Sequence, residues 1–332
     1  MDIDLAVFLP DWMNADWLGH PMIMWLNFFS IILSVLIYDL GLFSKKKNQA
    51  PSAKKSLINT LIYILLAVWF GWTVWTDLGP KAGMEFFTGY AMELSLSIDN
   101  IFVISLIFTS LSIPAQCRHR VLFWGILGVL LLRGIMIGLG AAMIAQFSWI
   151  LLVFGLFLLF TGFKMLFVDN EHKEMSENPI LKWMNNHLPI TQDLQGQKFF
   201  ARLPHPQNPA RKITFITPLF VALVLVEIAD LVFAVDSVPA VFAVTQDPYI
   251  VYTSNIFAII GLRSLFFLLE DMVHRFEYLS KALAFILVFI GGKITAAEML
   301  HYHIATEISL TVVLTLIASG VLISLLKTRN KN

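Results

Sequence analysis

Residues 92–100 read MELSLSIDN and place Glu93, Asp99 and Asn100 inside an apolar run long enough to cross a bilayer. Residues 227–237 read EIADLVFAVDS and contain a second pair of acids with the same spacing of six residues. A charged group inside the hydrocarbon layer costs free energy and is seldom found there without a function. The two stretches therefore predict a functional site within a membrane protein.

The composition is that of a membrane protein rather than a soluble one. The 332 residues are 58% hydrophobic and 14% charged, and the mean hydropathy is +0.75. Ordinary soluble domains are about half apolar and about a quarter charged, so this composition predicts an all-α polytopic membrane protein. Basic and acidic residues balance at 23 each, which gives no reason to expect a nucleic acid partner. Cys117 is the single cysteine, which excludes an internal disulfide or a cysteine-based metal site.

Nine apolar runs have roughly the 20 residues that a helix needs to cross a bilayer. Lys and Arg follow every odd-numbered run, and basic residues stay on the cytoplasmic side of a membrane. We therefore expect the N-terminus outside and the C-terminus in the cytoplasm. The runs lie near residues 21–43, 57–77, 85–110, 119–140, 145–168, 213–245, 250–270, 279–298 and 304–326.

The chain is expected to divide into five parts on this basis. The first residues lack the basic region of a cleavable signal peptide, so membrane insertion is expected to begin at the first span. The parts are an extracytoplasmic segment 1–20, transmembrane helices one to five in 21–168, a structured cytoplasmic linker 169–212, transmembrane helices six to nine in 213–326, and a cytoplasmic tail 327–332.

The two acidic stretches begin two units of three spans each, at about residues 85–168 and 213–298. An odd number of spans makes the two units cross the membrane in opposite directions. Such inverted repeats are typical of secondary transporters, whose substrate sites lie at the repeat interface near the middle of the membrane. The alignment pairs Glu93 with Asp230, Asp99 with Asp236, Asn100 with Ser237, Arg133 with Arg263, and Lys164 with Lys293.

The acids of the two stretches are expected to share a partner, because each would cost about 2.5 to 3.5 kcal/mol alone at the bilayer centre. At about 100° per residue, Glu93 and Asn100 lie on one helix face, whereas Asp99 is rotated about a third of a turn away. Both sets reach one cavity only if the helices pack tightly or unwind locally. Pro239 favours unwinding, because it has no N–H for the carbonyl of Val235.

The expected site contains carboxylate, carbonyl, amide and hydroxyl oxygens, without a thiolate or a histidine. Such ligands suit hard divalent cations, namely Mn²⁺, Mg²⁺ or Ca²⁺. Acids in excess of the metal's charge would bind protons when the metal leaves, as in a metal–proton antiporter. The predicted metal ligands are Glu93, Asp99, Asn100, Glu227, Asp230, Asp236 and Ser237.

A structural interpretation of some of these residues stays open. The acids could pair with bases of neighbouring spans, and those bases could hold the helices together or serve as counter-charges. Asp39 could contribute to the site or face the lipid headgroups at the cytoplasmic end of the first span. The residues considered for supporting roles are Asp39, Val235, Arg133, Arg263, Lys164 and Lys293.

The chain resembles the TerC family of bacterial integral membrane proteins, and most closely its Alx-type members. The resemblance rests on GYAMELSLSIDNIFV at residues 89–103 and EIADLVFAVDSVPA at residues 227–240. It continues through SNIFAIIGLR at 254–263, TGFK at 161–164 and YDL at 38–40, and it covers nearly the whole chain.

The resemblance implies a manganese exporter, named historically for tellurite resistance and linked to alkaline pH, whose intramembrane acids bind the metal. It adds Asn255 to the supporting residues. The expected protein is a transporter of the bacterial inner membrane that moves Mn²⁺ out of the cytoplasm by alternating access with proton exchange. No organic cofactor is expected. The expected partners are a divalent metal ion, the lipid bilayer and, as one option, a second copy of the chain.

Two other classes of function stay open. Paired intramembrane aspartates also activate water in aspartyl proteases, but the repeat and the extra acids favour a transporter that is not an enzyme. The other alternative is a tellurite-resistance or metal-handing protein that contacts other proteins through residues 169–212.

Overall fold

The computed structural model describes most of the chain. The residues outside the described part are 1–11, 13–14, 40–52, 148, 168–182, 185–186, 192–193, 206–207, 270–276, 301, 303 and 330–332. Within the helices, the side chains of Asp99, Asp236 and Arg263 also lie outside it.

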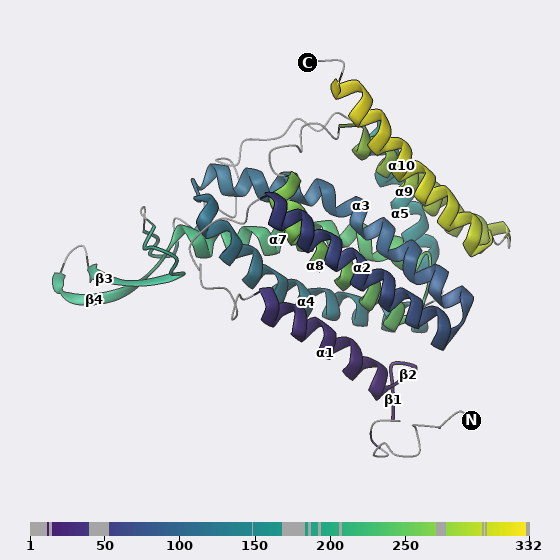
Figure 1. Ribbon diagram of the computed structural model, residues 1–332, viewed down its shortest axis with the longest axis horizontal. Helices are drawn as coiled ribbons and strands as arrows, with labels where there is room; N and C mark the ends of the chain where they lie inside the picture. Colours follow the sequence, from purple (N-terminus) through teal and green to yellow (C-terminus); the bar gives the residue numbers. More distant parts are fainter. Residues whose placement is uncertain are drawn as a thin grey trace.

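Nine long helices dominate the described residues and match the nine predicted spans one for one (Figure 1). Eight of them are long and apolar enough to cross a membrane. The other, α3, has 31 residues and carries Glu93 and Asp99. The protein is therefore an all-α polytopic membrane protein, as its composition predicts. The helices are α1 (Met22–Asp39), α2 (Ala53–Leu78), α3 (Pro80–Ser110), α4 (Ala115–Gln146), α5 (Trp149–Phe167), α7 (Pro218–Phe242), α8 (Pro248–Leu269), α9 (Glu277–Leu300) and α10 (Thr306–Arg329).

Prolines set the start of three helices. Pro80, Pro218 and Pro248 are the first residues of α3, α7 and α8, where a missing N–H costs no helical hydrogen bond. Asp247 caps α8, because its Oδ1 accepts a hydrogen bond from the backbone N–H of Tyr249 at 2.9 Å.

The helix α7 corrects one expectation. It runs from Pro218 through Pro239 to Phe242 without a break, so the unwinding predicted at Pro239 does not occur. Pro239 lies in the last turn, where it removes only one hydrogen bond close to the helix end. The side chain of Val235, whose carbonyl was expected to be freed, is 49% exposed. The acidic residues must therefore meet through close helix packing.

A β-hairpin replaces part of the expected sixth span. β3 (Phe200–His205) and β4 (Asn208–Ile216) pair antiparallel and project from one end of the helix bundle (Figure 1). The β-branched and aromatic run at 213–216 favours a strand, and α7 begins only at Pro218. The helical part of this span is therefore shorter than the predicted 213–245.

A second small sheet joins the N-terminal segment to the bundle. β1 (Asp16–Trp17) and β2 (His20–Pro21) pair across a turn at Leu18 and Gly19, both of which have positive φ. His20 Nε2 lies 2.8 Å from Asp247 Oδ2, next to the start of α8. This contact fixes the start of α1 against the turn between α7 and α8.

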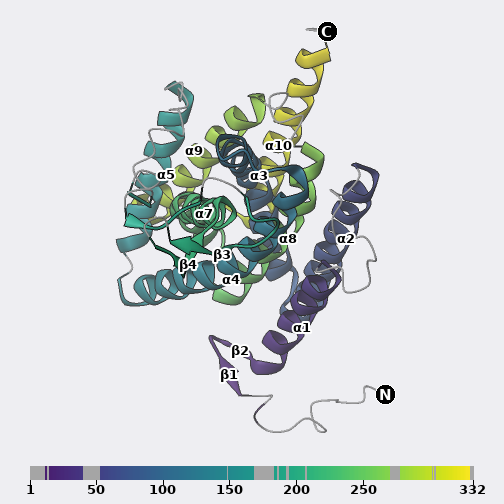
Figure 2. The same cartoon turned by 90° about the vertical axis from the view of Figure 1, so that its left-hand side faces the viewer.

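The helix α8 lies at the centre of the bundle. Residues Pro248–Phe267 are 88% buried, against 17% to 44% for the other seven candidate spans. Figure 2 looks at the hairpin end, with α1 and α2 on one side and α5 on the opposite side. Large apolar side chains of the outer helices are exposed, among them Leu65 (66%), Phe160 (68%) and Leu131 (70%). So broad an apolar surface is suited to contact with lipid.

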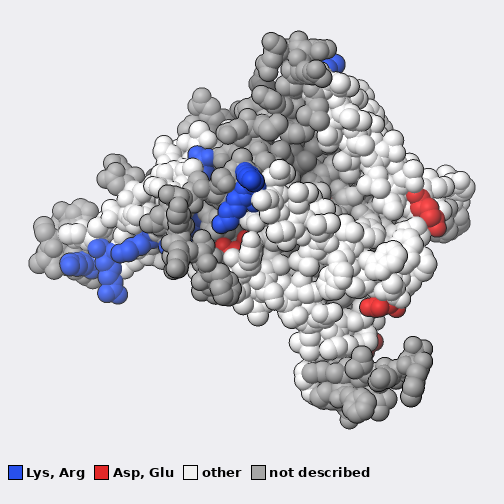
Figure 3. Space-filling view, in the orientation of Figure 1, with Lys and Arg blue, Asp and Glu red and all other residues white. Residues whose placement is uncertain are grey.

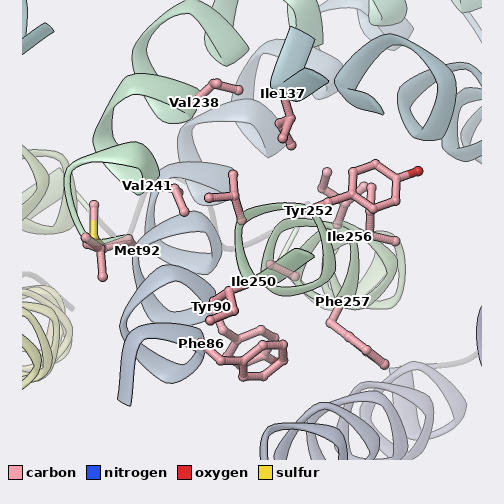
Figure 4. Close-up of a cluster of buried hydrophobic side chains, with 14 of the residues drawn as sticks. Phe86, Tyr90, Met92, Ile137, Val238, Val241, Ile250, Tyr252, Ile256 and Phe257 are labelled. Atoms are coloured by element: carbon pink, nitrogen blue, oxygen red, sulfur yellow. The ribbon is translucent and has the colours of Figure 1, made fainter. Parts of the chain in front are cut away.

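Two apolar clusters fill the bundle. The larger one includes rings of α1, α2, α3 and α8, and five pairs among Phe28, Phe70, Phe86 and Phe257 have ring centroids 4.7 to 6.2 Å apart. Figure 4 shows part of this cluster around α8. The smaller cluster joins the second half of α3, the start of α4, the start of α7 and the end of α8.

The helices α5 and α9 approach each other at glycines. A Cβ atom at Gly291 would lie 2.7 Å from the backbone oxygen of Gly155, and one at Gly162 would lie 2.9 Å from the backbone oxygen of Ala284. In the predicted alignment Gly162 corresponds to Gly291 and Gly155 to Ala284. The repeat therefore relates the contact of Gly291 with Gly155 to the contact of Gly162 with Ala284. The helix α3 packs against α8, and α4 packs against α7. Because the repeat pairs α3 with α7 and α4 with α8, it relates these two helix contacts to each other as well. The inverted repeat itself stays a prediction.

Charged residues gather at the two ends of the bundle, with an apolar surface between them. Figure 3 shows basic residues towards the hairpin end, with one acidic patch beside them, and further acidic residues at the opposite end. The exposed bases near the hairpin include Lys198, Arg202 and Lys212, and the exposed acids at the other end include Asp77 and Glu307.

Candidate ion site between four helices

The centre of the candidate site is Arg133 of α4, whose side chain is 1% exposed. Its Nη1 donates to Glu93 Oε1 at 2.6 Å and to Asn255 Oδ1 at 2.8 Å. The same nitrogen donates to Ser237 Oγ at 3.2 Å. One buried cation thus joins side chains of α3, α7 and α8 to α4.

Asp230 of α7 binds the other side of the guanidinium. Arg133 Nη2 donates to Asp230 Oδ1 at 2.9 Å and Nε donates to Oδ2 at 3.2 Å. Such a bidentate pair fixes both distance and orientation. Asn255 Nδ2 donates to Glu93 Oε2 at 3.0 Å, so both oxygens of Glu93 are hydrogen-bonded. We call these five side chains the Arg133 cluster: Glu93, Arg133, Asp230, Ser237 and Asn255.

The Arg133 cluster is buried, and it carries more acid than base. Glu93 and Asn255 are 0% exposed, Ser237 is 1% exposed, and the side chain of Asp230 is 12% exposed. Within the cluster, two carboxylates face one guanidinium, which leaves a formal charge of −1 when both acids are ionised. Buried charges are stable only when they are paired and hydrogen-bonded. Arg133 therefore makes it possible for both acids to lie inside the bundle, and the excess acid favours a further cation.

Helical spacing accounts for the meeting of these residues. Asp230 and Ser237, seven residues apart on α7, both reach Arg133, as one shared helix face requires. On α3, the residue seven positions after Glu93 is Asn100, which lines a cavity next to the cluster. The predicted convergence of the two acidic stretches is thus observed for Glu93, Asp230 and Ser237.

This cavity has a volume of about 40 Å³. Its polar lining is Asn100 and Asp230, and the rest of its wall is apolar and includes Ile104, Val129 and Phe266. Asn100 is 4% exposed, and within the described part its Oδ1 has no hydrogen-bond partner. A space of this size holds about one water molecule or an ion without its water shell.

Glu227 lies on α7 three residues before Asp230. Both of its carboxylate oxygens are buried and have no hydrogen-bond partner among the described residues. The carboxylate lies against Gly128 of α4, where even a methyl group would overlap it. An ionised carboxylate without a donor is costly in such surroundings, so Glu227 is another group that a cation would stabilise.

The remaining predicted residues lie elsewhere or outside the described part. Lys164 is exposed near the end of α5, and Lys293 of α9 donates to Ser309 Oγ at 2.9 Å. Asp39 ends α1 and accepts from Tyr63 Oη at 2.6 Å. These three residues lie on helices that contribute nothing to the Arg133 cluster. The contributions of the Asp99, Asp236 and Arg263 side chains stay predictions, because those side chains lie outside the described part.

Arg133 determines how the acids can bind a metal. Among the described residues, no group of three or more His, Cys, Asp or Glu side chains is placed to hold a metal ion. The guanidinium lies between Glu93 and Asp230 and donates to both. The two carboxylates thus already share a cation that belongs to the protein itself.

Two features of the site were not predicted from the sequence. Arg133 was considered a supporting counter-charge, whereas it contacts every other member of the cluster. The fit of Glu227 against Gly128 was not predicted at all. A signal for it existed, because Gly125 and Gly128 lie about one turn apart, and small residues at that spacing are typical of closely packed membrane helices.

Comparison with known proteins adds the family. Residues 78–332 match the "Integral membrane protein TerC family". The chain is 43% identical over 305 residues to an "Uncharacterized membrane protein" of Rickettsia bellii, which covers 91% of this chain and 97% of that protein. It is 40% identical over 303 residues to the "Putative membrane-bound redox modulator Alx" of Escherichia coli K12, covering 89% and 91% of the two chains. No solved structure matches.

The fold and the buried cluster define a polytopic membrane protein with a polar site inside its helix bundle. The chain belongs to the TerC family, which confirms the resemblance found at residues 89–103 and 227–240. Neither the family description nor the names of these relatives indicate an enzyme.

Proposed function

We propose that the protein exports Mn²⁺ from the cytoplasm across the bacterial inner membrane, by alternating access coupled to proton exchange. One observation carries the proposal. Two carboxylates, an amide and a hydroxyl from α3, α7 and α8 meet around one cation, Arg133, inside a membrane-spanning bundle. Ionisable groups at such a position mark an ion path more often than a structural contact.

The proposed metal ligands are the seven predicted oxygen donors on α3 and α7. Most of those in the described part belong to the Arg133 cluster or line the cavity at Asn100, whereas Glu227 lies on α7 against Gly128 of α4. Oxygen ligands suit Mn²⁺, Mg²⁺ and Ca²⁺ alike, and the TerC resemblance supplies the choice of Mn²⁺. The ligands are Glu93, Asp99, Asn100, Glu227, Asp230, Asp236 and Ser237.

The transport mechanism rests on the predicted inverted repeat. The repeat is supported by two contacts between α5 and α9 that it relates to each other. These are the contact of Gly291 with Gly155 and the contact of Gly162 with Ala284. Two such units can tilt against each other and open a central site to either side in turn. The exposed bases around the hairpin support a cytoplasmic position for that end of the bundle.

The name of the Alx relatives raises a redox function, which this chain supports less well. Cys117 is its only cysteine and is 4% exposed. A thiol–disulfide cycle needs a second thiol, and the chain has none. An aspartyl protease is also poorly supported by Asp230, because both of its oxygens accept from Arg133 instead of sharing a proton with a second acid.

Transport can be tested with the purified protein in liposomes that contain a Mn²⁺-sensitive dye and a pH-sensitive dye. We expect wild type to move Mn²⁺ and protons in opposite directions. Asp99→Asn and Asp236→Asn should each lower the rate by about tenfold or more, since loss of even an indirect metal contact has effects of that size. Lys212→Gln, at an exposed position on β4, is the control and should transport at the wild-type rate. Wild-type rates in both Asn variants would show that the metal follows another path.

Gly128→Ala tests the contribution of Glu227. The added methyl group would overlap the Glu227 carboxylate and push it off α4, so the rate of Mn²⁺ transport should fall. Thermal stability should change little, because Ala favours a helix by up to about 1 kcal/mol and the displaced group is the end of a flexible side chain. Gly138→Ala on the same helix is the matched control, since nothing lies within 4 Å of a Cβ atom there. Equal transport by the two variants would exclude a contribution of Glu227 to the path.

A further inference from the structure

We infer that Arg133 is a built-in counter-cation that exchanges with the transported metal. In this cycle its guanidinium holds Glu93 and Asp230 whenever no metal is bound, and incoming Mn²⁺ displaces it. The inference rests on the proposed function. It assigns to Arg133 of α4 the exchange with the metal that takes place both when the metal binds and when it leaves.

The guanidinium of Arg133 occupies the position that a metal shared by Glu93 and Asp230 would need. Every carboxylate oxygen of the Arg133 cluster already has a nitrogen donor within 3.2 Å. Arg133 itself donates to both oxygens of Asp230 and to one oxygen of Glu93. A metal ion that bridged Glu93 and Asp230 would need the place between the two carboxylates where the guanidinium lies, so metal and guanidinium compete for one position. Arg133 must therefore withdraw before the two acids can bind one metal.

The two carboxylates of the cluster need a cation after the metal has left. The cluster has a formal charge of −1 with Arg133 in place, and two bare carboxylates would remain if the metal left and nothing replaced it. Two uncompensated charges in a dry interior are strongly destabilising. A transporter that releases its ion must still return through a state without that ion. Arg133 supplies the missing cation for this return from within the chain.

The cavity next to the cluster gives an incoming ion a place beside Asp230. Its lining includes Asp230 and Asn100, and Asn100 Oδ1 has no hydrogen-bond partner in the described part. Arg133 is not among the described residues that line this cavity, so an ion there would lie beside Asn100 and Asp230 without first displacing the guanidinium. Its attraction for Asp230 would weaken the bidentate pair with Arg133. The cavity is thus the place where exchange begins.

The test compares Mn²⁺ binding and transport in wild type, Arg133→Gln and Arg133→Lys. Binding is measured on the purified proteins by calorimetry and by the rise of the melting temperature with Mn²⁺. We expect Arg133→Gln to bind Mn²⁺ about tenfold more tightly than wild type, or better, because the competing cation is gone. It should nevertheless transport more slowly, because only protons, and no side-chain cation, are then left to compensate Glu93 and Asp230 when the metal leaves. Arg133→Lys should be intermediate in affinity, since it keeps the charge but loses the planar fork.

The outcomes separate exchange from a structural role. A structural Arg133 predicts that Arg133→Gln binds Mn²⁺ no better than wild type, and that Mn²⁺ does not restore its stability. If Arg133→Gln does not fold, Arg133→Lys decides, and an affinity at or below that of wild type overturns the inference. Failure of wild type and all variants to bind or transport Mn²⁺ would instead refute the proposed function. Lys212→Gln should match wild type in every measurement.

Discussion

Arg133→Gln is expected to lower the free energy of unfolding by about 3 to 5 kcal/mol in metal-free detergent solution, and Glu93→Gln by only about 1 to 2 kcal/mol. Both changes remove the ion pair in which Arg133 Nη1 lies 2.6 Å from Glu93 Oε1. They differ in the charge they leave, because loss of Arg133 makes the formal charge of the cluster more negative, from −1 to −2, whereas loss of the Glu93 charge brings it to zero. Unfolding by a denaturing detergent, followed by tryptophan fluorescence, measures the difference.

The double variant Arg133→Gln/Glu93→Gln provides the internal control. It has the same formal cluster charge as wild type, so its destabilisation should be clearly smaller than the sum of the two single effects. Additive losses would mean that hydrogen bonds, and not buried charge, determine the stability of the cluster. Similar losses in the two single variants would contradict the charge argument directly.

The helices could be predicted because lipid restricts what a chain can do. A spanning segment needs about 20 apolar residues and must satisfy its backbone internally, so nine runs gave nine helices. The hairpin of β3 and β4 lies beyond that restriction. Its strands carry Pro204, Arg202 and Lys212 among apolar residues, which hides the alternation of a strand. Outside the membrane, water can form hydrogen bonds with the backbone, so a chain segment has more conformations open to it. For β3 and β4 the sequence pattern therefore did not distinguish a hairpin from an irregular linker.

The site could be predicted in part for a similar reason. The cost of burying acid singled out Glu93 and Asp230, and their equal spacing within the two stretches indicated that they meet. The partner could not be predicted, because four bases in the spans were available and spacing along one helix says nothing about distances between helices. Only the packing of α4 against α7 and α8, from which the long Arg133 side chain also reaches Glu93 of α3, selects Arg133.

Gly291→Ala is expected to destabilise the protein by about 1 to 3 kcal/mol, the usual cost of overfilling a well-packed contact. The new methyl group would lie 2.7 Å from the backbone oxygen of Gly155 and 2.7 Å from the backbone nitrogen of Leu159. Backbone cannot turn aside as a side chain can, so α5 and α9 would have to separate. Gly292→Ala is the control at the next position, because nothing lies within 4 Å of a Cβ atom there. It should gain up to about 1 kcal/mol from helix propensity.

Gly162→Ala extends this prediction to the inverted repeat. Its methyl group would lie 2.9 Å from the backbone oxygen of Ala284 and 2.9 Å from the backbone nitrogen of Val288. If the two units are related by an axis between α5 and α9, this contact is the counterpart of the one at Gly291. The two variants should then lose similar stability, and both should slow transport, because each forces apart the helices about which the units would tilt. A loss confined to Gly291→Ala would mean that the helices meet without the symmetry on which alternating access is proposed to depend.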